Sequence, residues 1–72
     1  MLTVEGVTAL CKAARIHALS VEIVGTRALV RIAPLKVDPK TAALNLYKAG
    51  GGAVVWSWNG GNEQLWISER AA

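Results

Sequence analysis

The sequence predicts an α+β domain with the element order αββαββ, in which two helices pack on one face of a four-stranded, mainly antiparallel sheet. Two stretches repeat apolar residues at helical spacing, and each is followed by a stretch in which apolar and polar residues alternate around a glycine-containing turn. A chain of 72 residues has room for one small domain, so we treat residues 1–72 as a single unit.

The first helix is predicted over about residues 3–17. Thr3 supplies a side-chain oxygen for the N-cap, and Glu5 lies in the first turn, where the helix dipole favours negative charge. Lys12 and Arg15 fall on the exposed side of the helix. The apolar stripe expected to face the core consists of Val7, Leu10, Cys11 and Ala14.

The opening segment "LTVEGVTALCKAARI" resembles the first helix of some excisionase-type winged-helix proteins. In that family a recognition helix follows directly, whereas here the next segment has the alternation of a strand. We therefore carry no function over from this resemblance.

The first hairpin is predicted over about residues 19–33, with Gly25-Thr26 as a two-residue type II′ turn. This turn pairs Val24 with Arg27 and Val21 with Val30, and so it fixes which residues share a face. The core face is expected to hold Leu19, Val21, Ile23, Ala28, Val30 and Ile32. The opposite face is expected to hold Ser20, Glu22, Val24, Arg27, Leu29 and Arg31.

The second helix is predicted over about residues 39–49, between clear start and stop signals. Asp38 is the expected N-cap, Pro39 takes the first helical position, and Gly50 follows the last turn. Lys40 and Lys48 point to solvent, and Leu44 is expected to be partly exposed. The face directed at the sheet consists of Ala42, Ala43, Leu46 and Tyr47.

The second hairpin is predicted over about residues 53–68, around "NGGN". Either Asn59-Gly60 or Gly60-Gly61 can form the two-residue loop, and both choices place the same side chains on the same faces. We expect Trp56 in the core and Trp58 half-buried at the hairpin end. The core face is predicted to hold Val54, Trp56, Trp58, Glu63, Leu65 and Ile67, and the outer face Ala53, Val55, Ser57, Gln64, Trp66 and Ser68.

Residues for catalysis or metal binding are scarce. The chain has one cysteine and one histidine, and its five acidic residues are scattered, so no metal site and no nucleophile–base pair can be assembled. Cys11 and His17, six residues apart on the predicted helix, lie on different faces. We expect a protein that is not an enzyme and uses no cofactor, with Cys11 packed as a small hydrophobic side chain.

The composition also favours a cytoplasmic location. The single cysteine excludes an internal disulfide and suits a reducing compartment. The sequence contains no apolar run of membrane-spanning length, and "MLTVEGVTAL" is too polar for a signal peptide.

The sheet face opposite the helices is the candidate functional surface, since nothing in the chain is predicted to cover it. An exposed tryptophan with arginines nearby is typical of protein interfaces and also of surfaces on which unpaired bases stack. Isolated apolar residues on a surface also occur without any function. The candidate contact residues are Arg27, Leu29, Arg31, Val55, Gln64 and Trp66, and a secondary basic surface consists of Lys12, Arg15, Lys40 and Lys48.

The sequence therefore predicts a small, non-catalytic binding protein, such as an adaptor, an inhibitor or a regulator of the kind that phages and mobile elements encode. Its partner on the open sheet face is expected to be another protein or a second copy of the chain, which would give a dimer. The alternative is a module that binds single-stranded nucleic acid through Arg27, Arg31 and Trp66, since the net charge of +3 is mildly basic.

Overall fold

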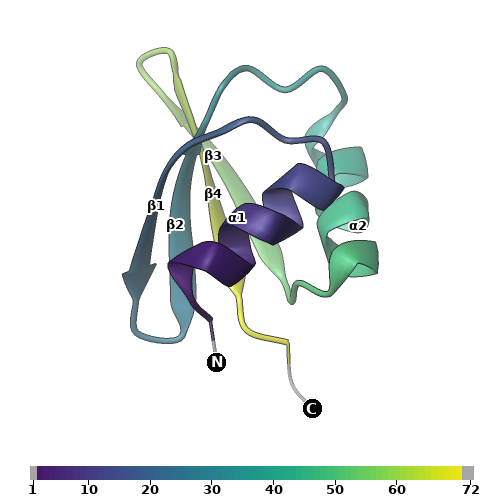
Figure 1. The fold of residues 1–72 in the computed structure, drawn as a ribbon. Coiled ribbons are helices and arrows are strands. Elements are labelled where there is room, and N and C mark those ends of the chain that lie inside the picture. Colours follow the sequence, from purple (N-terminus) through teal and green to yellow (C-terminus); the bar gives the residue numbers. More distant parts are fainter. Residues whose placement is uncertain (1, 71–72) are drawn as a thin grey trace.

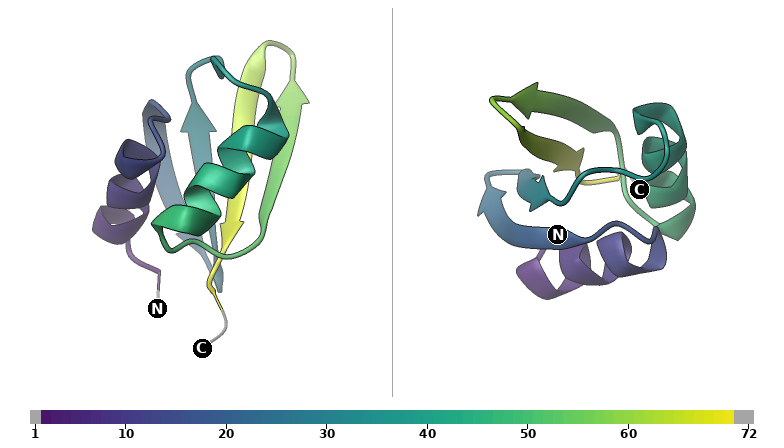
Figure 2. Two further views of the ribbon diagram at one scale, coloured as in Figure 1. Left: turned by 90° about the vertical axis from the view of Figure 1, so that its right-hand side faces the viewer. Right: turned by 90° about the horizontal axis from the view of Figure 1, so that it is seen from above.

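The computed structural model describes residues 2–70, and in this range it confirms the predicted αββαββ order (Figure 1). The elements are α1 (Val4–Ala13), β1 (Ala18–Val24), β2 (Arg27–Ile32), α2 (Pro39–Ala49), β3 (Val54–Asn59) and β4 (Asn62–Ser68). The sheet order is β1-β2-β4-β3 with every neighbouring pair antiparallel. Both helices lie on the same side of the sheet (Figure 2), as predicted. Neither helix of this part of the chain has the length and apolar character needed to cross a bilayer.

Both helices begin at the predicted caps. The Thr3 hydroxyl accepts a hydrogen bond of 2.9 Å from the Gly6 N–H, and the Asp38 carboxylate accepts one of 2.7 Å from the Thr41 N–H. The bond from the Thr41 backbone also lowers the pKa of Asp38 below its ordinary value, because it stabilises the charged carboxylate. Pro39 occupies the first turn of α2, where its missing N–H has no consequence.

The first helix is shorter than predicted, because it ends at Ala13 and not near residue 17. Arg15 adopts a left-handed conformation with φ 60°, and the Ile16 N–H donates to the Cys11 carbonyl at 2.8 Å. These are the features of a Schellman motif, which closes a helix and turns the chain away. His17 consequently lies in the connection to β1 and not on the helix. Gly50 closes α2 in the same way.

The glycines of the two hairpin loops determine the turn types. Gly25 has φ 64°, while Thr26 has a negative φ, which is the combination expected for the predicted type II′ turn. Gly60 and Gly61 have φ 59° and 89°, so the second loop is Gly60-Gly61, one of the two predicted possibilities. Two successive positive φ values correspond to a type I′ turn, which matches the twist of the flanking strands.

The core lies between the helices and one face of the sheet. The predicted stripe of α1 is buried or half-buried, and Ala42 and Leu46 of α2 are fully buried in the same core cluster. The central strands β2 and β4 supply the other side of the core. The buried hydrophobic residues are Val7, Cys11, Ala14, Ile16, Ala28, Val30, Ile32, Ala42, Leu46, Leu65 and Ile67.

One residue of the first hairpin leaves the core because of a β-bulge. The pairing of β1 with β2 matches the prediction from Val24↔Arg27 to Ser20↔Arg31, and then shifts by one residue so that Ala18 pairs with Ile32. The extra residue is Leu19, which is 58% exposed instead of buried. Because a bulge inserts one residue into a period-two pattern, it reverses which side chain faces the core.

The predicted burial of three aromatic residues also requires correction. Trp56 shares a face with Leu65, as predicted, but it is 40% exposed because β3 is an edge strand with a neighbour on one side only. Trp58 at the hairpin end is 60% exposed, more than the half-burial expected. Tyr47 is exposed and not directed into the core, and its ring contacts Arg70, whose guanidinium carbon is 4.0 Å from the ring centroid.

Candidate functional site: the uncovered sheet face

The face of the sheet that the helices leave uncovered carries alternate residues from all four strands. The strand pairing aligns these residues in rows that run across the sheet. We call this surface the open face. One row is Glu22, Leu29, Trp66 and Val55; the next is Ser20, Arg31, Gln64 and Ser57; and Val24, Arg27 and Ser68 form a third.

Three apolar side chains follow one another in the middle of the open face. Leu29 on β2 pairs with Trp66 on β4, and Trp66 pairs with Val55 on β3, so we call this set the apolar row. Val55 is 60% exposed, while Leu29 and Trp66 are half-buried by their neighbours. The indole of Trp66 therefore lies between two aliphatic side chains on a surface that neither helix covers.

Two arginines stand on either side of the apolar row. Arg27 and Arg31 precede and follow Leu29 by two residues on β2, so both point from the same face, and both are exposed. Within residues 2–70 neither guanidinium has a side-chain hydrogen bond or an ion pair. Glu22 lies at the β1 end of the row and is the acidic residue among these rows.

The six predicted contact residues all lie on this face and on adjacent strands. Arg27, Leu29 and Arg31 come from β2, Gln64 and Trp66 from β4, and Val55 from β3. Sequence reasoning missed that Leu29 lies directly beside Trp66. That contact depends on β2 pairing with β4, and no local signal in either hairpin specifies how the two hairpins dock.

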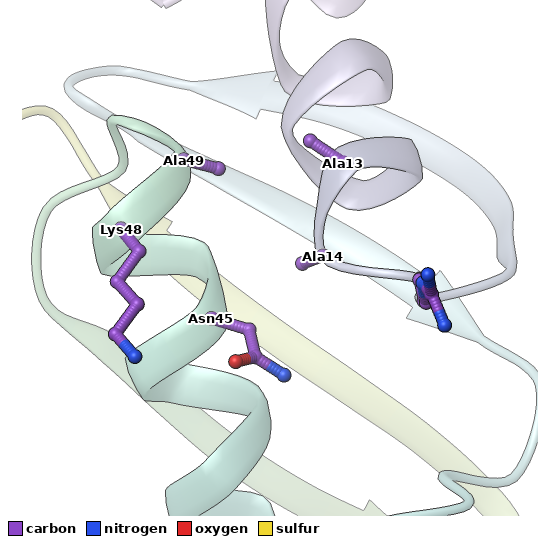
Figure 3. Close-up of a pocket in the computed structure, with 6 residues that line it drawn as sticks. Ala13, Ala14, Asn45, Lys48 and Ala49 are labelled. Atoms are coloured by element: carbon purple, nitrogen blue, oxygen red, sulfur yellow. The ribbon is translucent and has the colours of Figure 1, made fainter.

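The secondary basic surface is only partly brought together. Arg15 and Lys48 line a cavity of about 480 Å³ between the C-terminal ends of the two helices, with Asn45 and small alanines between them (Figure 3). Lys12 and Lys40 lie outside it. Asn45 was not expected there, because its position facing α1 depends on how the helices pack. Lys12 and Lys48 lie in the last turns of α1 and α2, where a cation also compensates the helix dipole.

The described residues offer little else for chemistry. Residues 2–70 contain no cluster of three or more side chains suited to hold a metal ion. Cys11 is buried in the core, and burial raises the pKa of its thiol because the thiolate loses solvation there. A thiol of this kind is a packing group and a poor nucleophile.

Comparison of the chain with family models, with curated proteins and with solved structures finds no match. The residues and the fold alone therefore carry the functional argument.

Proposed function

We propose that this chain is a small, non-catalytic binding protein whose open face contacts another protein. The observation that carries the proposal is the apolar row of Leu29, Trp66 and Val55, which runs across three strands on the side away from both helices. The proposal extends to the class of adaptor, inhibitor or phage-type regulator, in which a small chain acts by occupying a surface of a larger one.

The chemistry of the open face resembles that of known interfaces. Tryptophan and arginine are the residues most enriched among those that dominate binding energy, and an apolar centre with a charged rim is the usual arrangement. Trp66 supplies a large rigid ring between Leu29 and Val55, and Arg27 and Arg31 supply the rim. A row of side chains on a sheet is also rigid before binding, so little conformational entropy is lost on contact.

The charges of the rim specify the kind of partner. Arg27 and Arg31 carry charges that no acidic side chain within residues 2–70 neutralises, which favours an apolar patch bordered by carboxylates. Such rim charges act chiefly by accelerating association, so salt should slow binding.

Binding of single-stranded nucleic acid is the second candidate, and one observation favours it. Both guanidiniums are unpaired within residues 2–70 and flank the strand beside Trp66, an arrangement suited to a phosphate backbone and a stacked base. Two features favour the protein partner. Trp66 is the single aromatic residue of the open face, whereas proteins that bind single strands stack successive bases on several rings. Glu22 also lies on this face and would repel a phosphate backbone.

Affinity capture from the native host with matched variants tests the protein contact. The open-face variant is Trp66→Ala, Arg31→Ala, and the control is Leu44→Ala, Lys40→Ala, which removes one apolar and one basic exposed side chain from α2. Circular dichroism first establishes that both variants are folded. We expect a partner that the wild type and the control retain and the open-face variant loses. A partner that all three capture equally contacts another surface, and this result would contradict the proposal.

A further inference from the structure

The two edges of the sheet differ in how they are protected. β1 and β3 are the outer strands, and each pairs with one strand only among residues 2–70. The β1 edge has a β-bulge between Ala18 and Ser20 and a charged residue at Glu22, whereas a helix contacts both edge strands, α1 on β1 and α2 on β3. Bulges, charges and covering elements are the devices by which proteins prevent an edge strand from pairing with another chain.

The β3 edge has neither a β-bulge nor a charged residue. Its register with β4 is regular from Val54 to Asn59, and the strand contains no proline. No charged residue occurs between Lys48 and Glu63. Val55 and Trp58 are each 60% exposed, so the strand also presents apolar side chains to solvent on both of its faces. A regular, uncharged and apolar edge is a template for a further strand.

The direction of the backbone groups at this edge follows from the turn. Asn59 and Asn62 flank the two-residue loop, so they form a hydrogen-bonded pair, and such pairs recur at every second residue of the ladder. The Ser68 N–H, which donates to the Ala53 carbonyl at 2.8 Å, agrees with this alternation. The backbone N–H and C=O groups of Val54, Trp56 and Trp58 therefore point outward from the sheet.

We propose that β3 pairs with β3 of a second copy of this chain, antiparallel and about a two-fold axis. Only residues whose backbone groups point outward can form the hydrogen-bonded pairs. In one register Val54, Trp56 and Trp58 all form such pairs. This register places Trp56 opposite Trp56 of the second copy, and Val54 opposite its Trp58. A symmetric antiparallel pair is self-complementary, since each contact is made twice.

Charge does not oppose the approach of a second copy at this edge. The chain has a net charge of +3, so two copies repel each other overall, but β3 brings no charged residue of its own into contact. Pairing joins the two four-stranded sheets into a continuous one. It also places Val55 on the open face opposite Ser57 of the second copy, which extends the open face without covering it.

Sedimentation over a range of concentrations tests the pairing without disturbing the open face. Trp58→Lys places a charge on the β3 edge, and Leu44→Lys, at a residue 52% exposed on α2, is the matched control. We expect wild type and control to dimerise and Trp58→Lys to remain monomeric. A wild type that stays monomeric at high micromolar concentration overturns the proposal, as does a Trp58→Lys variant that dimerises like wild type.

A second pair of variants tests the register. Val55 and Ser57 of the second copy lie directly opposite each other, within disulfide reach, whereas two copies of Val55 are separated by more than about 7 Å. A mixture of Val55→Cys and Ser57→Cys should therefore form a disulfide-linked dimer on mild oxidation, and either variant alone should not. Equal linkage in the mixture and in the single variants would overturn this register.

The two proposals can fail separately. Trp66→Ala alters the open face and leaves the β3 edge intact, so this variant should still dimerise. A Trp66→Ala variant that is monomeric, together with a Trp58→Lys variant that dimerises, would place the self-contact on the open face and overturn the pairing through β3.

Discussion

The indole N–H of Trp56 donates a hydrogen bond of 2.9 Å to the carboxylate of Glu63 on the neighbouring strand. Trp56 pairs with Leu65, and Glu63 pairs with Trp58, so the bond runs diagonally across β3 and β4 on the helix side of the sheet. It holds the indole at the rim of the core with its polar edge paired. The tryptophan thus stabilises the sheet edge and does not fill the centre of the core.

This position predicts an order of stability among core variants. Leu65 is fully buried on a central strand, so Leu65→Ala should cost about 3–5 kcal/mol of unfolding free energy through lost packing and a cavity. Trp56→Ala should cost less, about 2 kcal/mol, because part of the ring is already solvated. Urea denaturation monitored by circular dichroism measures both. A larger loss in Trp56→Ala would place the indole at the centre of the core.

The buried thiol predicts a dependence of stability on pH. Burial raises the pKa of Cys11 above its ordinary value of 9.0, so the folded state keeps the proton more tightly than the unfolded state does. The resulting stabilisation is fully present below pH 9.0 and is lost as the pH rises through the folded-state pKa. Relative to Cys11→Ala, the wild type should lose stability as the pH rises above 9.0. Parallel slopes for the two proteins would contradict the assignment.

The contacts of Arg70 connect the segment after β4 with α2, and we expect them to contribute measurably to stability. Its guanidinium donates to the carbonyl of Gly51 at 3.0 Å and to that of Tyr47, and it lies over the Tyr47 ring. Arg70→Ala should reduce the unfolding free energy by about 1 kcal/mol, since the bonds are partly solvated. Tyr47→Phe keeps the ring and the backbone carbonyl and should have little effect. Thermal unfolding of both variants distinguishes the ring contact from a role of the phenol.

Local signals in the sequence were sufficient to predict the elements and most pairings. Thr3 and Asp38 form the expected caps, and the Gly25-Thr26 turn fixes the pairing of Val24 with Arg27. Each of these is decided by a few neighbouring residues and by backbone geometry that glycine or a short polar side chain permits.

Some features that the sequence did not reveal are local irregularities without a sequence signal, and others depend on tertiary contacts. Arg15 ends α1 in a left-handed conformation, a position for which glycine would have been the usual signal. The bulge that exposes Leu19 leaves no mark on the alternation of the strand. The exposure of Trp56 and the contact of Leu29 with Trp66 both follow from the docking of the hairpins through β2 and β4, which puts β3 at an edge.

The nucleic-acid alternative makes a prediction that salt can test. If the open face bound single strands through Arg27 and Arg31, affinity for a mixed oligonucleotide pool would fall steeply with salt as counterions are released. Trp66→Ala would also remove a stacking contribution of about 1–3 kcal/mol per base. On the protein-contact proposal, we expect no saturable binding in a fluorescence titration at low salt. Saturable binding that Trp66→Ala weakens would favour the alternative.

Photo-cross-linking in the native host tests the central claim, contact through the open face, most directly. A photoreactive phenylalanine derivative replaces either Val55 on the open face or Leu44 on α2, which are 60% and 52% exposed, so both positions are similarly accessible. We predict that the derivative at position 55 cross-links to a second protein that mass spectrometry identifies, and that the derivative at position 44 does not. Cross-linking to a partner from position 44, with none from position 55, would contradict the account.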